Sequence, residues 1–127
     1  MSAWFAIALG GATGAVLRHA VGLWVQRGIP DFPWGTFVIN VTGSFALGFL
    51  AKATGAPDGN AALRAGLTIG LCGGYTTFST FSFDTVALLE SGGGRLAALN
   101  VVASVTLALL ATFAGIGLGR LLLGAQR

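Results

Sequence analysis

Four apolar stretches dominate the chain, and each reaches the length of about 20 residues that an α-helix needs to cross a bilayer. They run over 3–25, 34–54, 62–90 and 96–124, and turn-rich links separate them, including a Pro-Asp-Gly signal at 57–59. Only 9% of the 127 residues are charged and 54% are apolar, which leaves too few charges to cover a soluble domain. The sequence predicts an all-α integral membrane protein, with residues 1–127 forming a single domain of four transmembrane helices.

The first apolar stretch has no basic region ahead of it and runs longer than a signal-peptide core, so we expect a permanent first helix. Glycines recur four residues apart in three of the stretches. They are Gly10 and Gly14, Gly66, Gly70 and Gly74, and Gly115 and Gly119. Small residues at this spacing let helices approach closely in lipid. We therefore expect tight helix packing between subunits. Because four short helices enclose little volume, we also expect an oligomer, with any pathway or site formed where two or more chains meet.

The basic residues are scattered near the ends of the stretches, so a net charge of +3 does not indicate a nucleic-acid surface. Four spans would place four basic residues on one side of the membrane and three on the other. The first group is Lys52, Arg64, Arg120 and Arg127, and the second is Arg18, Arg27 and Arg95. This difference selects no orientation. Insertion both ways, which permits an antiparallel homodimer, and a single orientation set by other features both stay open.

The third stretch changes character at residues 73–84, GGYTTFSTFSFD. Gly73 and Gly74 each lower helix stability by about 1 kcal/mol relative to alanine, and β-branched threonines follow at once. We therefore expect the third helix to be broken at Gly73–Thr77. Non-helical backbone at membrane depth is tolerated only where it is buried in protein or lines a wet cavity. A small bound cation is one partner for the freed carbonyl groups.

Hydroxyl, amide and phenyl side chains gather at helical spacing on three of the predicted helices. They are Thr36, Asn40 and Ser44 of the second stretch, Thr77, Phe78, Thr80, Phe81 and Asp84 of the third, and Asn100 and Ser104 of the fourth. A single phenyl ring is explained by core packing, and a single hydroxyl by a hydrogen bond to its own helix. The amide of Asn40 requires a partner, which is either another helix or a passing solute. Taken together, they indicate one polar pathway.

The chemistry of this pathway favours an anion. The first, second and fourth stretches carry no mid-span carboxylate, which a proton-coupled cation exporter needs. Amide and hydroxyl hydrogens and the electropositive edges of phenyl rings stabilise a small anion without a fixed charge. Arg18 and His19, late in the first stretch, add positive potential at a possible vestibule, although Arg18 equally suits a side chain that snorkels to the interface. The GGGR segment at 92–95 lacks the strand and lysine of a phosphate loop.

The segment GGYTTFSTFSFD, together with PWGTFVINVTGSF at 33–45 and GGATGAVLR at 10–18, resembles the small fluoride channels of the Fluc or CrcB family over nearly the whole chain. The resemblance implies a passive fluoride channel, not an enzyme, that exports cytoplasmic fluoride across the bacterial inner membrane and relieves its toxicity. It also implies a dual-topology antiparallel homodimer with two pores.

The resemblance further assigns roles to individual residues. It implies that Phe78 and Phe81 turn their ring edges to fluoride, and that Asn40 and Ser104 line the pore. It implies that Gly73 and Thr76 of both subunits offer main-chain carbonyls to a central sodium ion, which is structural and not transported. Asn100 and Ala108 stand where relatives often carry other residues. Tyr75 stands in place of a smaller aliphatic side chain, and we expect its hydroxyl to find a local partner.

Two other classes of protein fit parts of the pattern. A small multidrug exporter shares the span count and dual insertion, but it predicts a mid-span glutamate in the first helix, and residues 3–17 contain no acidic side chain. A non-transport scaffold would use its glycines and serines only to assemble helices in the membrane. Fluoride efflux from vesicles separates a channel from a scaffold.

Overall fold

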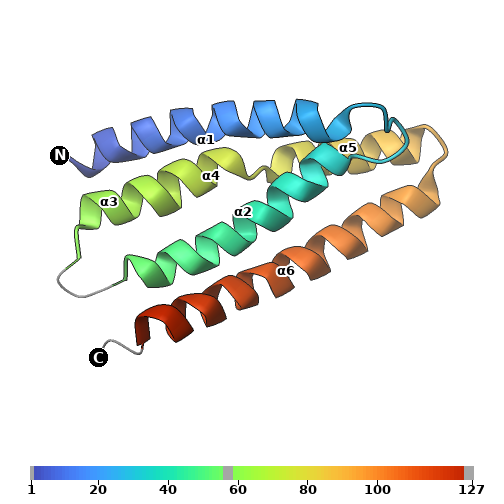
Figure 1. The fold of residues 1–127 in the computed structure, drawn as a ribbon. Helices are drawn as coiled ribbons and strands as arrows, with labels where there is room; N and C mark the ends of the chain where they lie inside the picture. The colour runs from blue at the N-terminus through green and yellow to red at the C-terminus, as the bar shows by residue number, and fades with distance from the viewer. Residues whose placement is uncertain (1, 56–58, 125–127) are drawn as a thin grey trace.

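The computed structural model describes residues 2–55 and 59–124, and every regular element in these ranges is helical, which confirms the predicted all-α class (Figure 1). The elements are α1 (Ala3–Gln26), α2 (Trp34–Ala53), α3 (Ala61–Ala65), the π-helix η1 (Gly66–Cys72), α4 (Gly73–Tyr75), α5 (Phe78–Glu90) and α6 (Gly94–Gly124). The turn predicted at Pro57 and Asp58 and the charge of Arg127 lie outside the described residues.

Three of the helices are long and apolar enough to cross a membrane, namely α1, α2 and the Gly94–Leu122 part of α6. These helices make the chain a multi-pass membrane protein. The remaining predicted span, 62–90, corresponds to α3, η1 and α4, which follow one another without a gap over 61–75, and to α5 after an interruption at 76–77. This segment is therefore two helical runs rather than one continuous helix.

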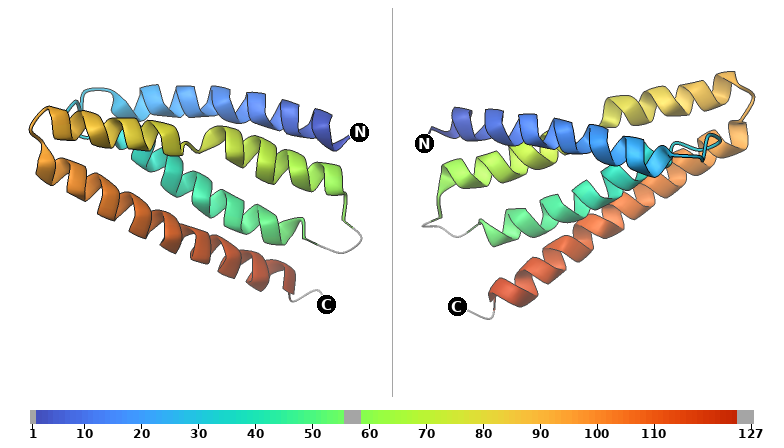
Figure 2. Two further views of the ribbon diagram at one scale, coloured as in Figure 1. Left: turned by 180° about the vertical axis from the view of Figure 1, so that it is seen from behind. Right: turned by 45° about the horizontal axis from the view of Figure 1, so that its top comes forward.

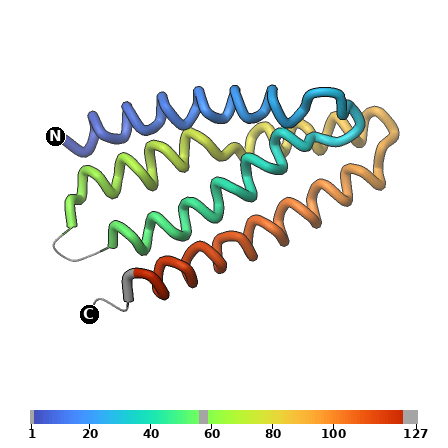
Figure 3. The backbone as a smooth tube through the Cα atoms, viewed as in Figure 1, coloured from blue at the N-terminus to red at the C-terminus, as the bar shows by residue number. Residues whose placement is uncertain are grey.

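Four segments alternate in direction along the bundle, namely α1, α2, the run from α3 to α5, and α6 (Figure 1). The starts of α1 and α3 and the ends of α2 and α6 lie at one end, and the links 27–33 and 91–93 lie at the other (Figures 1 and 3). Helix α6 packs along α2, and α1 packs along α3, η1 and α4. Helix α5 packs mainly on the first part of α6 (Figure 2). The two halves of the interrupted segment thus have different neighbours.

The glycine stripes pack helices within one chain, so the expectation that they pack between subunits is wrong for these residues. A Cβ at Gly14 would overlap the Leu71 carbonyl oxygen of η1, and a Cβ at Gly70 would lie 2.8 Å from the Ile7 carbonyl oxygen of α1. On the other side of the bundle, a Cβ at Gly115 would overlap the Phe45 carbonyl oxygen of α2. The glycines therefore set the close approach of α1 to η1 and of α6 to α2.

The break in the third segment lies within the predicted range but is narrower. Gly73 is still helical, with φ −64° and ψ −37°, and residues 66–72 before it form a π-helix where ordinary α-helix was expected. Only Thr76 and Thr77 are extended, with φ/ψ of −78°/158° and −153°/111°. Gly74 remains helical because it packs on α1, where a Cβ would lie 2.5 Å from the Gly11 carbonyl oxygen.

Gln26 at the end of α1 shapes the 27–33 link. Its Nε2 donates to the Phe32 carbonyl at 2.9 Å, and its Oε1 accepts from the Gly35 backbone N–H at 3.0 Å. Gly28 in the same link has a φ of 76°, which a side chain would strain. The link is thereby folded against the start of α2 at one end of the bundle.

Burial in the single chain is inverted relative to a soluble protein. Thr77, Asn100 and Ser104 are buried, whereas large apolar side chains such as Phe83 and Phe113 are exposed. Trp4 and Trp24 are also exposed, near the two ends of α1, which is where membrane proteins place tryptophan at the lipid interfaces. An apolar exterior around buried polar groups requires lipid, or a second chain, as its surroundings.

Candidate functional site

Asn40 of α2 holds the extended segment between α4 and α5. Its Oδ1 accepts a hydrogen bond from the Thr77 backbone N–H at 2.8 Å, and its Nδ2 donates to the Thr77 carbonyl at 3.0 Å. One carboxamide therefore satisfies both backbone groups of a residue that is only 7% exposed. The sequence left open another helix or a solute as the partner of Asn40, and the structure shows a protein partner, the extended Thr77 that precedes α5. One Nδ2 hydrogen is left for a further acceptor.

The Thr77 side chain begins α5. Its Oγ1 accepts from the Thr80 backbone N–H at 3.1 Å, which is the N-cap interaction that threonine favours. The two threonine hydroxyls also lie 2.9 Å apart, with Thr77 donating to Thr80. The break is thus supported from both directions, by Asn40 on the backbone of Thr77 and by Thr77 on the first turn of α5.

Two carbonyl groups at the break leave the helical ladder. The Thr77 N–H would normally donate to the Gly73 carbonyl, but it donates to Asn40 instead. The Thr76 carbonyl accepts from Nη1 of the half-buried Arg18 at 3.3 Å, which uses one of its two lone pairs. Gly73 lies exposed on the surface of the chain. The carbonyls predicted for sodium are therefore available in part, and Arg18 shares one of them.

Five of the residues predicted to line a pore meet in one cavity of about 230 Å³, which we call the Phe cavity. Its lining is Asn40, Ser44, Thr76, Thr77, Phe78, Phe81, Ser104, Val105 and Ala108. The rings of Phe78 and Phe81 are 5.4 Å apart and tilted by 42°. Phe81 is buried, but Phe78 is 77% exposed, so the cavity opens to the surface of the single chain. No side chain of the lining is charged.

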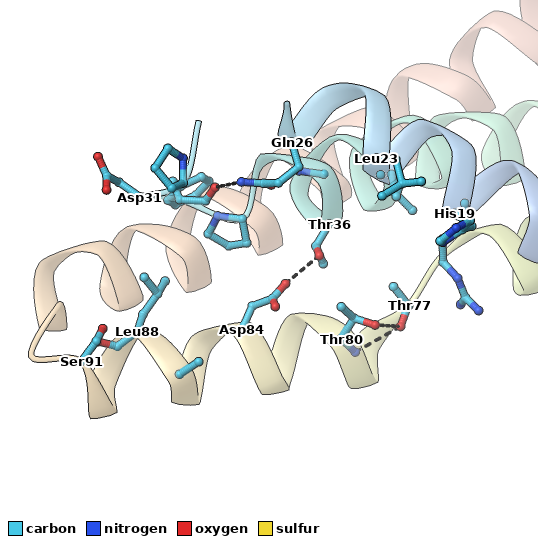
Figure 4. A pocket seen from close by; sticks show the side chains of 18 of the residues that line it. His19, Leu23, Gln26, Asp31, Thr36, Thr77, Thr80, Asp84, Leu88 and Ser91 are labelled. Atoms are coloured by element: carbon cyan, nitrogen blue, oxygen red, sulfur yellow. Dashed lines mark hydrogen bonds between the residues drawn. The ribbon is translucent and has the colours of Figure 1, made fainter. Parts of the chain in front are cut away.

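A larger cavity of about 700 Å³, here the Asp84 cavity, lies between α1, α2 and α5 (Figure 4). Arg18, His19, Thr36, Thr80 and Asp84 are among its lining residues. Thr36 of α2 donates to Asp84 Oδ2 of α5 at 2.6 Å (Figure 4). Thr36, Thr80 and Arg18 therefore lie apart from the Phe cavity, whereas Thr77 lines both cavities.

A buried network joins α5 to α6 beside the Phe cavity, and sequence reasoning missed part of it. Asn100 is 0% exposed. Its Nδ2 donates to Thr85 Oγ1 at 2.9 Å, and its Oδ1 accepts from the Ser104 hydroxyl at 3.3 Å. Asn100 and Ser104 do share a helix face as predicted, but Thr85 was not identified. The available signal was its hydroxyl, one residue after Asp84 on a mostly apolar helix.

The Tyr75 hydroxyl lies 3.1 Å from Thr42 Oγ1 of α2. The prediction that this hydroxyl finds a local partner is confirmed. Thr42 also donates back to the Val38 carbonyl of its own helix at 2.7 Å, so the Tyr75 hydroxyl is the donor of the pair. Tyr75 thereby attaches the end of α4 to α2, next to the break.

Comparison with known proteins identifies clear relatives. A family model described as CrcB-like protein, Camphor Resistance (CrcB), matches residues 5–116. The fluoride-specific ion channel FluC of Rhizobium meliloti (strain 1021) is 51% identical over 120 residues, covering 90% of this chain and 93% of the relative. FluC of Geobacter sulfurreducens is 48% identical over 119 residues, with 91% and 95% covered. FluC 1 of Streptomyces avermitilis is 46% identical over 114 residues, with 89% and 92% covered.

Proposed function

Because the chain belongs to the CrcB family, we propose that it forms a passive membrane channel for fluoride. The names of its relatives support this assignment. The uncharged amide, hydroxyl and phenyl side chains that line the Phe cavity support it as well. A channel needs no catalytic group or bound nucleotide, only a path on which the ion exchanges water for protein contacts.

The Phe cavity is the observation that carries the proposal. Its hydrogen-bond donors are the free N–H of Asn40 and the hydroxyls of Ser44 and Ser104, and its aromatic edges come from Phe78 and Phe81. Donors and ring edges stabilise an anion, and the neutral lining does not hold it by a full charge. A cavity of about 230 Å³ has room for a small halide together with several water molecules.

The Asp84 cavity is the entrance in this proposal. It is larger than the Phe cavity, and Thr77 lines both, so in this proposal the ion passes from one cavity to the other beside Thr77. Arg18 is the cationic residue of its wall, which also carries the carboxylates of Asp31 and Asp84, and Asp84 accepts a hydrogen bond from the Thr36 hydroxyl. Arg18 is therefore the group of this wall that would attract an anion.

A second, oppositely inserted copy completes each pore in this proposal. Phe78 is 77% exposed, so a partner chain is needed to cover the open side of the Phe cavity. The near-even distribution of basic residues between the two sides permits both orientations. A two-fold axis then repeats the cavity and gives two pores per dimer.

We propose that the carbonyl groups at the break hold a structural sodium ion, although the Thr76 oxygen also accepts a hydrogen bond from Arg18. Gly73 and Thr76 would hold it with main-chain oxygens, the hard ligands that such a cation prefers. In this proposal each subunit supplies these two oxygens, and the ion lies between the two subunits. When bound, it would offset the carbonyl dipoles that the two breaks bring together. Among the described residues no cluster of histidine, cysteine or carboxylate side chains offers an alternative metal site.

The biological task follows from acid chemistry. Outside an acidified cell some fluoride is protonated to neutral HF, which crosses lipid and ionises again in the more alkaline cytoplasm. Passive export from the cytoplasm across the inner membrane relieves this accumulation. An inside-negative potential of 100 mV contributes about 2.3 kcal/mol per exported charge.

Reconstituted vesicles test the proposal directly. Vesicles loaded with potassium fluoride and carrying the purified chain should release fluoride to an external electrode once valinomycin removes the opposing potential. Vesicles loaded with potassium chloride serve as the control and should retain chloride. A scaffold protein releases neither anion, so fluoride retained at the level of protein-free vesicles would contradict the channel assignment.

A further inference from the structure

Helix α5 is weakly embedded in the chain. Phe81 is its only buried residue, and its backbone is separated from α4 by the extended Thr76 and Thr77. Two consecutive side chains attach it to other helices. Asp84 accepts from Thr36 of α2, and Thr85 accepts from Asn100 of α6 at 2.9 Å. The position of Phe81 therefore depends on a small number of polar contacts.

The contact between Thr85 and Asn100 belongs to a chain of hydrogen bonds whose direction is fixed. The Phe81 carbonyl can only accept, so the Thr85 hydroxyl donates to it, at 2.7 Å. The Thr85 oxygen must then accept from Asn100, which places the Asn100 Nδ2 on that side. The Asn100 Oδ1 consequently faces Ser104, whose hydroxyl donates to it at 3.3 Å.

Both ends of this chain lie at the Phe cavity. Ser104 and Phe81 line the cavity, whereas Asn100 and Thr85 do not. Asn100 is fully buried, so water cannot replace either of its contacts. Each donor in the chain has one acceptor, and the loss of the Thr85 hydroxyl leaves an Asn100 N–H and the Phe81 carbonyl without this partner.

We propose that Asn100, acting through Thr85, is a positioning residue that fixes Phe81 in the anion site and sets the direction of the Ser104 hydroxyl. This inference rests on the proposed function, because it specifies how the Phe cavity is held in the geometry that receives the ion. At rest the Ser104 hydrogen is directed to Asn100, so the hydroxyl must turn to donate to an anion. The turn breaks the 3.3 Å contact, the longest link in the chain.

The test uses full-length protein in vesicles, with Thr85→Val to remove the hydroxyl at nearly constant shape and Thr85→Ser to restore it. Ser82→Ala is the matched control, because the Ser82 hydroxyl also bonds back along α5, to the Phe78 carbonyl, but bonds to no residue of α6 among those described. Two quantities are measured: fluoride efflux, and the ¹⁹F resonance of 4-fluorophenylalanine placed at position 81 in fluoride-free buffer.

Thr85→Val should lower efflux roughly tenfold, which corresponds to a barrier to the ion raised by about 1.4 kcal/mol, and should shift or broaden the ¹⁹F resonance. Thr85→Ser should return both quantities to near the wild type, and Ser82→Ala should change neither. Wild-type efflux and an unchanged resonance in Thr85→Val would overturn the inference, as would a Thr85→Ser variant as impaired as Thr85→Val.

If Thr85→Val does not yield a dimer, Asn100→Leu replaces it, with the same expected loss of efflux and shift of the resonance. An Asn100→Leu variant that matches the wild type in both then overturns the inference. Wild-type vesicles that retain fluoride contradict the proposed function itself. A conducting wild type with an unaffected Thr85→Val contradicts only the role of Asn100 and Thr85.

Discussion

Asn40→Asp is the substitution for which the structure gives the sharpest prediction. The aspartate keeps the shape of asparagine and can still accept from the Thr77 N–H, which lies 2.8 Å from Oδ1. At the other oxygen, however, a carboxylate replaces the donor that now reaches the Thr77 carbonyl at 3.0 Å. The variant therefore loses one hydrogen bond, places two acceptors face to face and adds a negative charge to the Phe cavity.

The magnitude follows from the burial of Thr77. Because this residue is 7% exposed, water cannot satisfy its carbonyl, and an unsatisfied buried polar group costs about 1–3 kcal/mol. The added carboxylate repels an anion about 4 Å away by roughly 4 kcal/mol at an effective dielectric constant of 20. At 1.4 kcal/mol per factor of ten, the repulsion of roughly 4 kcal/mol alone corresponds to a fall in fluoride flux of about 100-fold or more.

The assay is fluoride efflux from vesicles at matched protein density, with the dimer checked by size-exclusion chromatography in detergent. Thr13→Val is the matched control, because the Thr13 hydroxyl is exposed on α1 and bonds only to the Leu9 carbonyl of its own helix among the described residues. It should conduct within about twofold of the wild type, as expected for a surface change. Near-normal efflux through a dimeric Asn40→Asp would refute the role given to Asn40.

Three further outcomes are expected. Phe81→Ile should reduce efflux by at least about tenfold while leaving the dimer intact, since it removes the buried ring edge from the Phe cavity; unchanged efflux would exclude Phe81 from the ion path. Replacing all sodium by a large organic cation should lower the thermal midpoint of the dimer, by the equivalent of about 2.7 kcal/mol where sodium had been at 100 times its dissociation constant; an unchanged midpoint would argue against a cation at Gly73 and Thr76. Thr36→Val should destabilise the chain by about 1.5–3 kcal/mol, the range for a hydrogen bond to a charged group, because it removes the 2.6 Å bond to Asp84. Denaturant unfolding in detergent measures this loss, and a shift below about 0.5 kcal/mol would show that Asp84 does not depend on Thr36.

The sequence predicts the parts of this structure that depend on long continuous patterns of apolar residues. The apolar stretches give the bounds of α1, α2 and α6 to within one or two residues, because a helix in lipid needs continuous apolar length. The meeting of Asn40, Phe78, Phe81 and Ser104 was also predictable, since polar side chains at membrane depth need one another or a solute.

The spacing of the glycines does not predict which helix each of them contacts. The four-residue glycine repeats indicate close helix contact, but the same repeat suits a neighbour in the same chain and one in another chain. The structure shows Gly14 against Leu71 and Gly115 against Phe45, both within the chain. The width of the break was overestimated for a related reason. Helix propensity assigns a cost to Gly73 and Gly74, but packing of Gly74 on α1 outweighs it.

The Asp84 and Thr85 pair shows why a polar track read from sequence mixes two kinds of residue. Asp84 bonds to α2 and lines the larger cavity, whereas the adjacent Thr85 bonds to α6 and lines neither cavity. A hydroxyl in the sequence can contact the ion or hold the wall that contacts it, and only coordinates separate these roles.

A neutral Phe cavity has a consequence for how the proposed channel works. A fixed positive charge would bind fluoride tightly and slow its release, whereas conduction requires sites that an ion can enter and leave quickly. Asn40 and Ser104 already have protein partners. Asn40 donates one hydrogen to Thr77 and can offer the ion its second, whereas Ser104 must release Asn100 before its hydroxyl can donate to the ion. The protein contacts thus compete with the ion for the same donors. This competition keeps the site weak enough for passage while the buried network keeps it in shape.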